Sequence, residues 1–298
     1  MIGLGAKYLT AAGFGRYRIT AASLGNAWMF KPWLRAVTKA AILAAFGQDD
    51  GWQVIGATNR YLNQLAAIDR DKATALAGFI NEDPMMVCSL GLEVPGVTMP
   101  WRLLKGNGTA YFDMQETVDT TAVYTAGMKA DTSETNTGFM VGCRSASSTQ
   151  RLQFQLWRGD QTAYTALQTT NVNSGADWTQ HHILKADIAA GKTWVDDVQQ
   201  MSGVTGSYSS AKILLFTIMT GSNVETPSIH YMSFYKKTKN GEDVKWLVPF
   251  NDGGTAKFIN LVASMASGTK VFETQQGSGS FTIEYTLPDG TPWTPSTP

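Results

Sequence analysis

Residues 246–281 read WLVPFNDGGTAKFINLVASMASGTKVFETQQGSGSF, and this stretch decides the fold class. An apolar run leads into Asp-Gly-Gly, a second apolar run follows, and the segment ends in alternating Gly and Ser. Apolar runs separated by a glycine-rich turn are typical of a β-hairpin. The stretch therefore predicts two paired strands followed by a tight passage to a last strand.

The details of this stretch predict where each strand ends. Residues 245–249 form a strand that Pro249 ends, because proline cannot donate a hydrogen bond to a neighbouring strand. Residues 257–261 begin the closing hairpin. Glycines here supply positive φ angles and close backbone approach, since a phosphate-binding loop would need a following helix. The tight final pass, which we expect to return to the first strand of the same domain, contains Gly277, Gly279 and Phe281.

Short runs of alternating apolar and polar residues precede this stretch, between residues 109 and 237. Turn signals separate them at roughly ten-residue spacing, and β-branched and aromatic residues are frequent. The runs are TAYFDMQ, AVYTAGMKA, GFMVGCRS, RLQFQLWRG, HHILKADI, KTWVDDV, KILLFTIMT and IHYMSFYKK. They predict an antiparallel sandwich, and the lack of a fixed period disfavours a solenoid or propeller.

Residues 31–100 predict a smaller helical region. A first helix over 33–46 begins near Pro32 and is stopped by Gly47. Thr58 is expected to cap a second helix and Asp71 a third, although the two could form one bent helix. The remainder, residues 84–100, contains three prolines and predicts an extended connector. The expected organisation is an arm (1–30), a helical region with connector (31–100), a sandwich (101–287) that folds by itself, and a tail (288–298).

The N-terminal arm and first helix are expected to serve assembly. The arm has no helical or strand period, yet it is too aromatic for a free tail, so it needs a partner surface. The first helix spreads apolar residues around most of its sides, which predicts a trimer or dimer; packing of the helices on their own sandwich is the alternative. The assembly candidates are Tyr8, Phe14, Tyr17, Trp28, Phe30, Trp33, Leu34, Val37, Ile42 and Phe46.

Composition limits the partners. The 298 residues contain 24 Lys plus Arg and 24 Asp plus Glu, and charged residues make up only 16%. Zero net charge argues against nucleic acid or an anionic membrane as a partner. Lys7, Arg16 and Arg18 interrupt the pattern of a secretory signal. Cys88 and Cys143 lack metal-ligand spacing, which predicts two unpaired buried thiols.

The strand order resembles the concanavalin A-like, laminin-G-like jelly-roll family, as found in tailed-phage structural proteins and surface proteins of gut-associated bacteria. The resemblance covers about residues 101–285 and is most specific at the C-terminal unit, MSFYKKTKNGEDVKWLVPFNDGG, AKFINLVASMASGTKVFE and GSGSF. It implies a mainly β, antiparallel jelly-roll sandwich. Asp197 stands where the family has glycine, which implies a looser or bulged hairpin there.

No arrangement of residues points to an enzyme or a cofactor. Adjacent Asp196 and Asp197 predict a turn, because neighbouring side chains of a strand face opposite ways and cannot form a catalytic pair. His181 and His182 also face opposite ways, which disfavours a zinc site with His230. No calcium-ligand spacing is found among Asp131, Asn136, Asn171, Asn173 and Asp177.

Exposed aromatic residues are what a sugar-binding face would need, since pyranose rings stack on flat aromatic surfaces. Packing inside the sandwich is the alternative role for each. The candidates are Trp157, Tyr164, Trp178 and Tyr208.

The resemblance and the arm together predict a non-enzymatic structural protein of a phage virion: a head fibre, capsid decoration or tail component. Its partners would be other virion proteins, copies of itself and host-surface or mucosal glycans bound by the sandwich, with no cofactor. The alternative is a carbohydrate-binding module of a bacterial cell surface.

Overall fold

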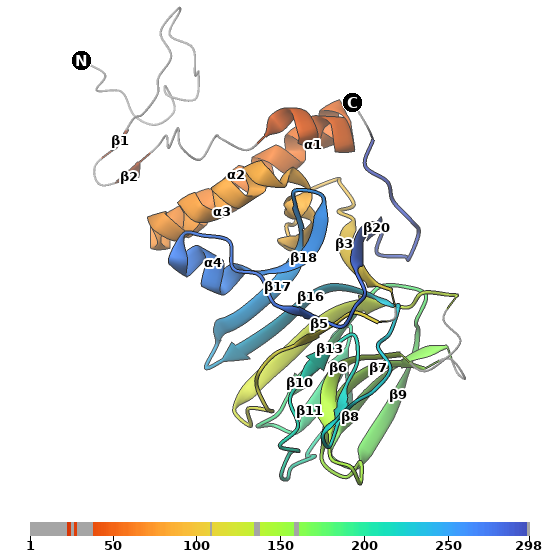
Figure 1. The fold of residues 1–298 in the computed structure, drawn as a ribbon. Coiled ribbons are helices and arrows are strands. Elements are labelled where there is room, and N and C mark those ends of the chain that lie inside the picture. Colours follow the sequence, from red (N-terminus) through yellow and green to blue (C-terminus); the bar gives the residue numbers. More distant parts are fainter. Residues whose placement is uncertain are drawn as a thin grey trace, which may run out of the picture.

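The computed structural model describes residues 38–107, 109–133, 138–157 and 161–296, with the backbone of two short paired strands, β1 (Ser23–Leu24) and β2 (Ala27–Trp28). In this part of the chain two β-sheets pack face to face, and helices cover part of the outer face of the first sheet (Figure 1). The predicted fold class, a mainly antiparallel β-sandwich preceded by a smaller helical region, is confirmed. Apart from β1 and β2, the predicted arm lies outside the described residues.

The first sheet has the order β12-β11-β10-β5-β16-β17-β18, and β3 joins β16 to β20. Its strands are β3 (Trp101–Gly106), β5 (Ala122–Lys129), β10 (His182–Asp187), β11 (Lys192–Val195), β12 (Val198–Met201), β16 (Tyr231–Lys239), β17 (Glu242–Asp252), β18 (Thr255–Asn260) and β20 (Phe281–Thr286).

The second sheet has the order β19-β4-β13-β6-β7-β8-β9; β14 pairs with β6, and β15 pairs with β14. Its strands are β4 (Tyr111–Asp113), β6 (Gly138–Arg144), β7 (Arg151–Trp157), β8 (Thr162–Leu167), β9 (Thr170–Asp177), β13 (Leu214–Leu215), β14 (Met219–Thr220), β15 (Asn223–Val224) and β19 (Gln275–Gln276). Each of the eight predicted runs contains a strand, whereas β8 and β9 were not predicted.

The hairpin in residues 246–281 is present, but Pro249 does not end its first strand. β17 continues to Asp252, and Pro249 lies opposite Phe258 of β18. β16 pairs with β17 only as far as Leu247. At Pro249 the strand therefore has β18 as its ladder neighbour on one side only, and proline is tolerated in a strand that has such an unpaired edge.

The second half of this stretch contains a short helix that was not predicted from the sequence. Helix α4 (Leu261–Ser267) follows β18 directly, and Asn260 Oδ1 accepts a hydrogen bond from the backbone N–H of Ala263. A side-chain acceptor at this position is a standard N-cap. Gly268, with φ of 72°, ends the helix.

The final pass to the first strand is confirmed. β20 pairs with β3 along its whole length, from Phe281 opposite Gly106 to Thr286 opposite Trp101. Gly277 has φ of 79°, and a Cβ atom there would collide with the backbone carbonyl of Thr109. Glycine is therefore required where the chain turns back against β3 and its following loop.

The first helix of the described residues does not include Thr38. Helix α1 (Lys39–Phe46) begins after Thr38, whose ψ of 88° is not helical and whose hydroxyl donates to the carbonyl of Asn81 at 3.3 Å. The prediction of one helix over 33–46 is therefore wrong at Thr38, and residues 33–37 lie outside the described residues. The predicted stop at Gly47 is confirmed.

Two long helices follow, α2 (Gln48–Ile68) and α3 (Arg70–Glu82). Thr58 caps neither of them: it lies inside α2, where its buried hydroxyl donates to the carbonyl of Val54 at 2.8 Å. Asp69, rather than Asp71, caps α3 by accepting from the backbone N–H groups of Asp71 and Lys72. A capping residue between the two helices keeps them separate.

Part of the predicted connector is helical. Residues Pro84–Ser89 form a 3-10 helix, η3, instead of an extended segment. Pro84 occupies its first turn, where a missing N–H costs nothing. Met86, Val87 and Cys88 are buried, so apolar packing holds this segment against its neighbours.

The helices pack on their own sandwich. A core of α1, α2, α3 and η3 residues is completed by four buried side chains of the first sheet and α4: Val248, Phe250, Ile259 and Leu261. An ion pair crosses the same boundary, since Arg102 Nη1 on β3 lies 2.6 Å from Oδ2 of Asp83, the residue after α3. Asp83 Oδ2 also accepts from the backbone N–H of Asn251 on β17 at 2.7 Å.

The C-terminal segment, which we predicted as a tail, returns to α1. The ring of Trp293 lies 5.2 Å from that of Phe46 and 5.5 Å from that of Tyr285. The backbone N–H of Ser296 donates to the carbonyl of Ala45 at 3.3 Å. These contacts connect the last described residues to the first described helix.

Candidate functional site

The outer face of the second sheet carries a group of polar and aromatic side chains. On β7, Leu152, Phe154 and Leu156 are buried in the core between the sheets. Because successive side chains of a strand point to opposite faces, Gln153 and Gln155 point away from that core. With residues of β6, β8 and β9 that point the same way, they form what we name the polar face: Phe139, Gln153, Gln155, Tyr164, Asn171 and Asn173.

The strand registers place four of these residues in one row. Gln155 lies opposite Phe139 on β6 and opposite Tyr164 on β8, and Tyr164 lies opposite Asn173 on β9. Neighbouring strands are about 4.8 Å apart. The row therefore alternates an aromatic ring and a carboxamide across four adjacent strands.

Burial differs along the polar face. Gln153 and Gln155 are only 1% and 4% exposed although they point away from the core, whereas Tyr164 is half-buried and Asn173 is exposed. The Asn173 Oδ1 atom accepts a hydrogen bond from the backbone N–H of Gly175 at 2.8 Å, which orients its amide. The face thus has a closely packed floor and a solvent-exposed rim.

Arg144 extends the polar face at β6. Its guanidinium lies 5.4 Å from the ring centroid of Phe139, and its Nη2 atom is 3.0 Å from Oε1 of Glu225. Gly142 lies between Arg144 and Phe139 in the strand, so no side chain separates the two. A Cβ atom at Gly142, where φ is 139°, would collide with the carbonyl oxygen of Leu152.

This arrangement suits a ligand with many hydroxyl groups. Each carboxamide offers both donors and acceptors, as a sugar hydroxyl does. Aromatic rings supply flat apolar surface for the C–H side of a pyranose ring. Apolar surface with a few placed polar groups is the usual composition of a small-molecule site.

The predicted glycan-binding residues have different fates. Tyr164 belongs to the polar face. Trp178 is 4% exposed in the core, with its ring 6.0 Å from that of His230, so it is no longer a candidate. Tyr208 packs against the same core with a buried hydroxyl, and burial raises its pKa. Only the backbone of Trp157 is described, opposite Thr162.

Four residues of this site were not predicted from the sequence: Phe139, Arg144, Gln153 and Gln155. The signal for the two glutamines is present in RLQFQLW, where Gln153 and Gln155 alternate with three apolar residues. The positions of Phe139 and Arg144 beside them depend on the pairing of β6 with β7.

Of the predicted assembly residues, the structure describes the side chains of two. Ile42 is fully buried among the helices and Phe46 is half-buried against Trp293. Of Trp28 only the backbone is described. The remaining assembly candidates lie outside the described residues: Tyr8, Phe14, Tyr17, Phe30, Trp33, Leu34 and Val37.

Asp196 and Asp197 form the predicted turn, between β11 and β12. Both have positive φ angles, 48° and 63°, as in a tight two-residue hairpin turn. The bulge that the resemblance implied for this hairpin is found as a register shift between Thr193 and Trp194, two residues before the turn. The turn itself is therefore tight rather than loose.

The Asp196 carboxylate instead binds a histidine. His182 Nδ1 lies 2.5 Å from Oδ2 of Asp196, and His182 Nε2 lies 2.5 Å from the carbonyl oxygen of Asp177. A carboxylate and a carbonyl can only accept, so hydrogen bonds to both of them require both ring nitrogens of His182 to donate, as they do in the protonated imidazole. Burial lowers the pKa of His182, but these partners outweigh it and the pKa lies above its ordinary value of 6.5.

The His182–Asp196 pair predicts a pH dependence of stability. Burial raises the pKa of Asp196, but hydrogen bonds, with that from His182 the largest, bring it below its ordinary 3.8. The contribution of Asp196 to the stability of the fold is present above pH 3.8 and is lost as pH falls through its lowered pKa. The contribution of His182 to stability is present below pH 6.5 and is lost as pH rises through its raised pKa. We expect Asp196→Asn to reduce the free energy of unfolding more at pH 5.5 than at pH 9, measured by denaturant titration.

A suitable control is Asp187→Asn, a change on the same strand as His182. It should cost a similar amount at both pH values. A cost of Asp196→Asn that does not vary with pH would contradict the assignment of a charged pair.

No metal site is found among the described residues, where no group of three or more His, Cys, Asp or Glu side chains lies together. Asp131 binds Lys105 at 2.6 Å, and Asp177 Oδ1 accepts from the backbone N–H of Thr179 at 2.9 Å. Asn136 lies outside the described residues.

None of the helices in the described ranges is long and apolar enough to span a membrane.

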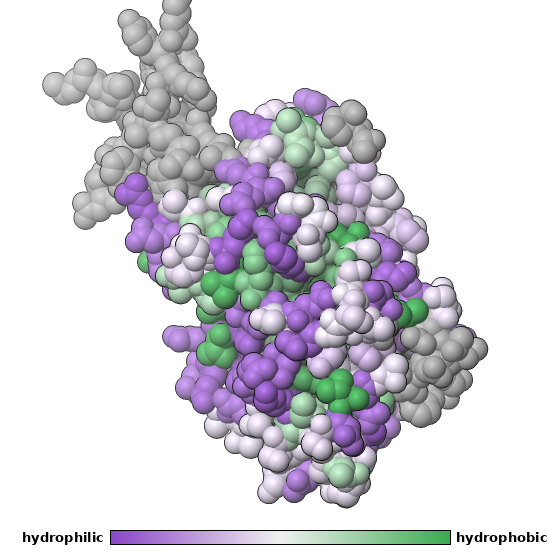
Figure 2. Space-filling model, viewed as in Figure 1, coloured by the Kyte–Doolittle hydropathy of each residue, from purple (hydrophilic) through white to green (hydrophobic). Residues whose placement is uncertain are grey.

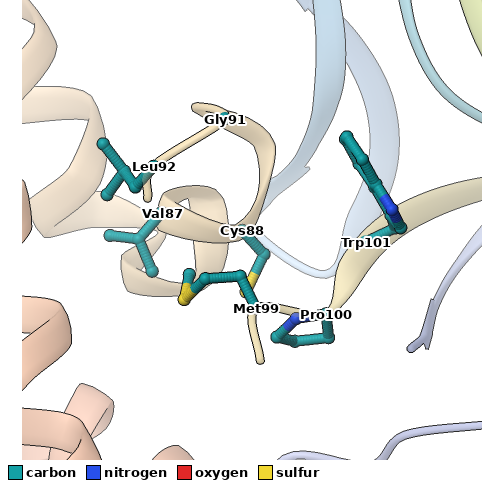
Figure 3. A pocket seen from close by; sticks show the side chains of 7 residues that line it. All are labelled: Val87, Cys88, Gly91, Leu92, Met99, Pro100 and Trp101. Atoms are coloured by element: carbon teal, nitrogen blue, oxygen red, sulfur yellow. The ribbon is translucent and has the colours of Figure 1, made fainter. Parts of the chain in front are cut away.

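A small cavity lies between η3 and the start of β3 (Figure 3). Its volume is about 170 Å³, below the roughly 300–1,000 Å³ of usual ligand sites. Burial raises the pKa of the Cys88 thiol there to about 12, so the thiol is protonated and unreactive. The cavity is lined by Val87, Cys88, Gly91, Leu92, Met99, Pro100 and Trp101.

On the molecular face drawn in Figure 2, hydrophobic side chains form only small separate patches on a mostly hydrophilic sandwich.

Similarity to known proteins is found in structure and not in sequence. No protein-family model and no curated protein matches the sequence. Among solved structures, the chain is similar to a protein of Bacteroides ovatus ATCC 8483 that is named as an inferred carbohydrate-binding protein, with 15% identity and a TM-score of 0.41. The similarity covers 62% of this chain and 60% of that one, so it spans less than two thirds of the relative's length.

Proposed function

We propose that this chain is a non-enzymatic carbohydrate-binding protein and that the polar face of the second sheet holds the sugar. The observation that supports the proposal is the row in which Phe139, Gln155, Tyr164 and Asn173 alternate ring and carboxamide on adjacent strands. The proposal rests on the chemistry of these residues.

The row suits recognition because its groups are held in place before binding. Gln155 is 4% exposed and lies on a central strand of its sheet, so its amide loses little freedom when a ligand arrives. Rigid groups lower the entropic cost of association. Tyr164 supplies a half-buried aromatic ring to the row, and an aromatic anchor often dominates the binding energy.

We expect Tyr164→Ala to weaken sugar binding by about 30-fold, the effect of a binding hot spot of about 2 kcal/mol. The full-length chain would first be screened on a glycan array. The strongest oligosaccharide would then be titrated by calorimetry against both proteins.

The matched control is Trp194→Ala, which removes a half-exposed aromatic side chain from the outer face of the first sheet, where Lys185 Nζ lies 4.9 Å from its ring. It should leave sugar affinity unchanged. If Trp194→Ala abolished sugar binding while Tyr164→Ala did not, the sugar site would lie on the first sheet and the proposed location on the second sheet would be wrong. Absence of binding to any glycan would refute the proposed function.

The virion setting remains a prediction from the family resemblance and the aromatic arm. So do the homo-oligomer and the contacts with other virion proteins. A bacterial cell-surface module would use the same polar face. Both settings are compatible with the proposed sugar binding, which concerns the second sheet alone.

A further inference from the structure

Two arginines lie side by side at one end of the polar face. In the register of β6 and β7, Arg144 is directly opposite Arg151, which puts their Cα atoms about 5 Å apart. Like charges in such a pair repel each other. Among the described residues, the one acid within ion-pair distance of either arginine is Glu225, which binds Arg144. One positive charge is therefore left over.

The same end of the face has hydrogen-bond donors without acceptors. Within the described part of the chain, Nε of Arg151 and Nε2 of Gln153 are buried and have no hydrogen-bond partner. Arg151 and Gln153 are two residues apart on β7 and so point to the same side. Arg151 uses its Nη2 atom to donate to the carbonyl of Thr169 at 3.1 Å, which positions the guanidinium without neutralising it.

The surroundings of Arg151 disfavour its positive charge. Burial, and then the charge of Arg144, lower the pKa of Arg151. A guanidinium stays protonated in proteins even so. The arrangement therefore keeps an uncompensated cation and two unused donors close together, and a bound anion would relieve both.

We propose that Arg144, Arg151 and Gln153 bind the carboxylate of an acidic sugar, so that the ligand of the polar face is a glycan containing uronic or similar acids. This inference rests on the proposed sugar binding and specifies its substrate class. The planar guanidinium matches a carboxylate through two parallel N–H···O bonds. One uncompensated positive charge corresponds to one carboxylate, and the row from Phe139 to Asn173 would hold the neighbouring sugar units.

The test compares acidic glycans with neutral copies of the same chains. Hyaluronan, polygalacturonate and alginate would each be immobilised beside a form in which the carboxyl groups have been reduced to alcohols. The full-length chain is expected to bind at least one acidic form about tenfold or more tightly than its reduced form, as a charge-assisted bidentate contact would give. The difference should shrink as salt is raised.

Variants assign the effect to this end of the face. Arg151→Gln should remove the preference for the acidic form and leave binding of the reduced form unchanged, whereas Arg151→Lys should keep part of the preference because it retains the charge without the planar fork. Lys185→Gln, an equal loss of charge on the outer face of the first sheet, should keep the full preference. The salt titration of the unmodified chain needs no variant and applies even if Arg151→Gln folds poorly.

Each other outcome contradicts the inference in a distinct way. Equal binding of acidic and reduced forms would overturn the acidic-sugar assignment and leave the proposed function standing. An equal loss of both forms in Arg151→Gln, or a preference that Lys185→Gln also removes, would overturn the role of this arginine. Absence of binding to every form, together with a glycan array without hits, would overturn the proposed function as well.

Discussion

Asp83→Ala is expected to reduce the free energy of unfolding by about 3–5 kcal/mol, the cost of leaving a buried charge without its partner. Arg102 is 2% exposed and Asp83 is 6% exposed, so water cannot replace the lost carboxylate. The contact is an ion pair at 2.6 Å without the angles of a good hydrogen bond, which makes the charge itself the main contribution. The substitution also removes the acceptor of the Asn251 N–H.

The matched control is Asp243→Ala. Asp243 binds Lys236 at 2.8 Å, and both side chains are about one-third exposed. Exposed pairs of this kind contribute about 0–1 kcal/mol. Denaturant unfolding of the two variants beside the unmodified chain measures both values, and a cost below about 1 kcal/mol for Asp83→Ala would show that the pair does not hold helices and sheet together.

The second large effect concerns the sandwich without its helices. Residues 101–296 alone are expected to aggregate, whereas residues 38–296 are expected to stay soluble and unfold cooperatively. Removing residues 38–100 would uncover four side chains that are fully buried, Val248, Phe250, Ile259 and Leu261, and would also leave Arg102 without Asp83. Contiguous apolar surface of this kind drives association.

This expectation is opposite to the one from the sequence, in which the sandwich folds by itself. Expression of the two segments followed by gel filtration and thermal unfolding decides between them. A soluble, monomeric 101–296 segment with a cooperative transition would show that the helical layer is dispensable for folding.

The sequence by itself determined the fold class and most of the strands, but not β8 and β9. Alternation in AVYTAGMKA and RLQFQLW is a local property with a period of two, because successive side chains of a strand face opposite ways. Turn signals act locally as well, which is why the hairpin of residues 246–281 and the Asp196–Asp197 turn were predicted correctly. The amides of Gln153 and Gln155 were equally visible in this alternation, although their partners were not.

Only the tertiary structure decided which residues meet. Thr58 was expected to cap a helix, but burial against its neighbours continues α2 through it. Trp178 could have faced solvent or core, and packing between the sheets buries it. The physical reason is that capping and turn preferences amount to about 1 kcal/mol each, whereas burying a large side chain amounts to several.

The candidate site depends on the tertiary structure in the same way. Phe139, Gln155, Tyr164 and Asn173 become neighbours through the registers of β6, β7, β8 and β9, and Arg144 meets Arg151 through the first of these pairings. A shift of one residue in any register would turn the amides toward the core and the leucines toward solvent. The sequence determined which side chains can share a face of a strand, and burial of the opposite face between two sheets decided which of them lie together.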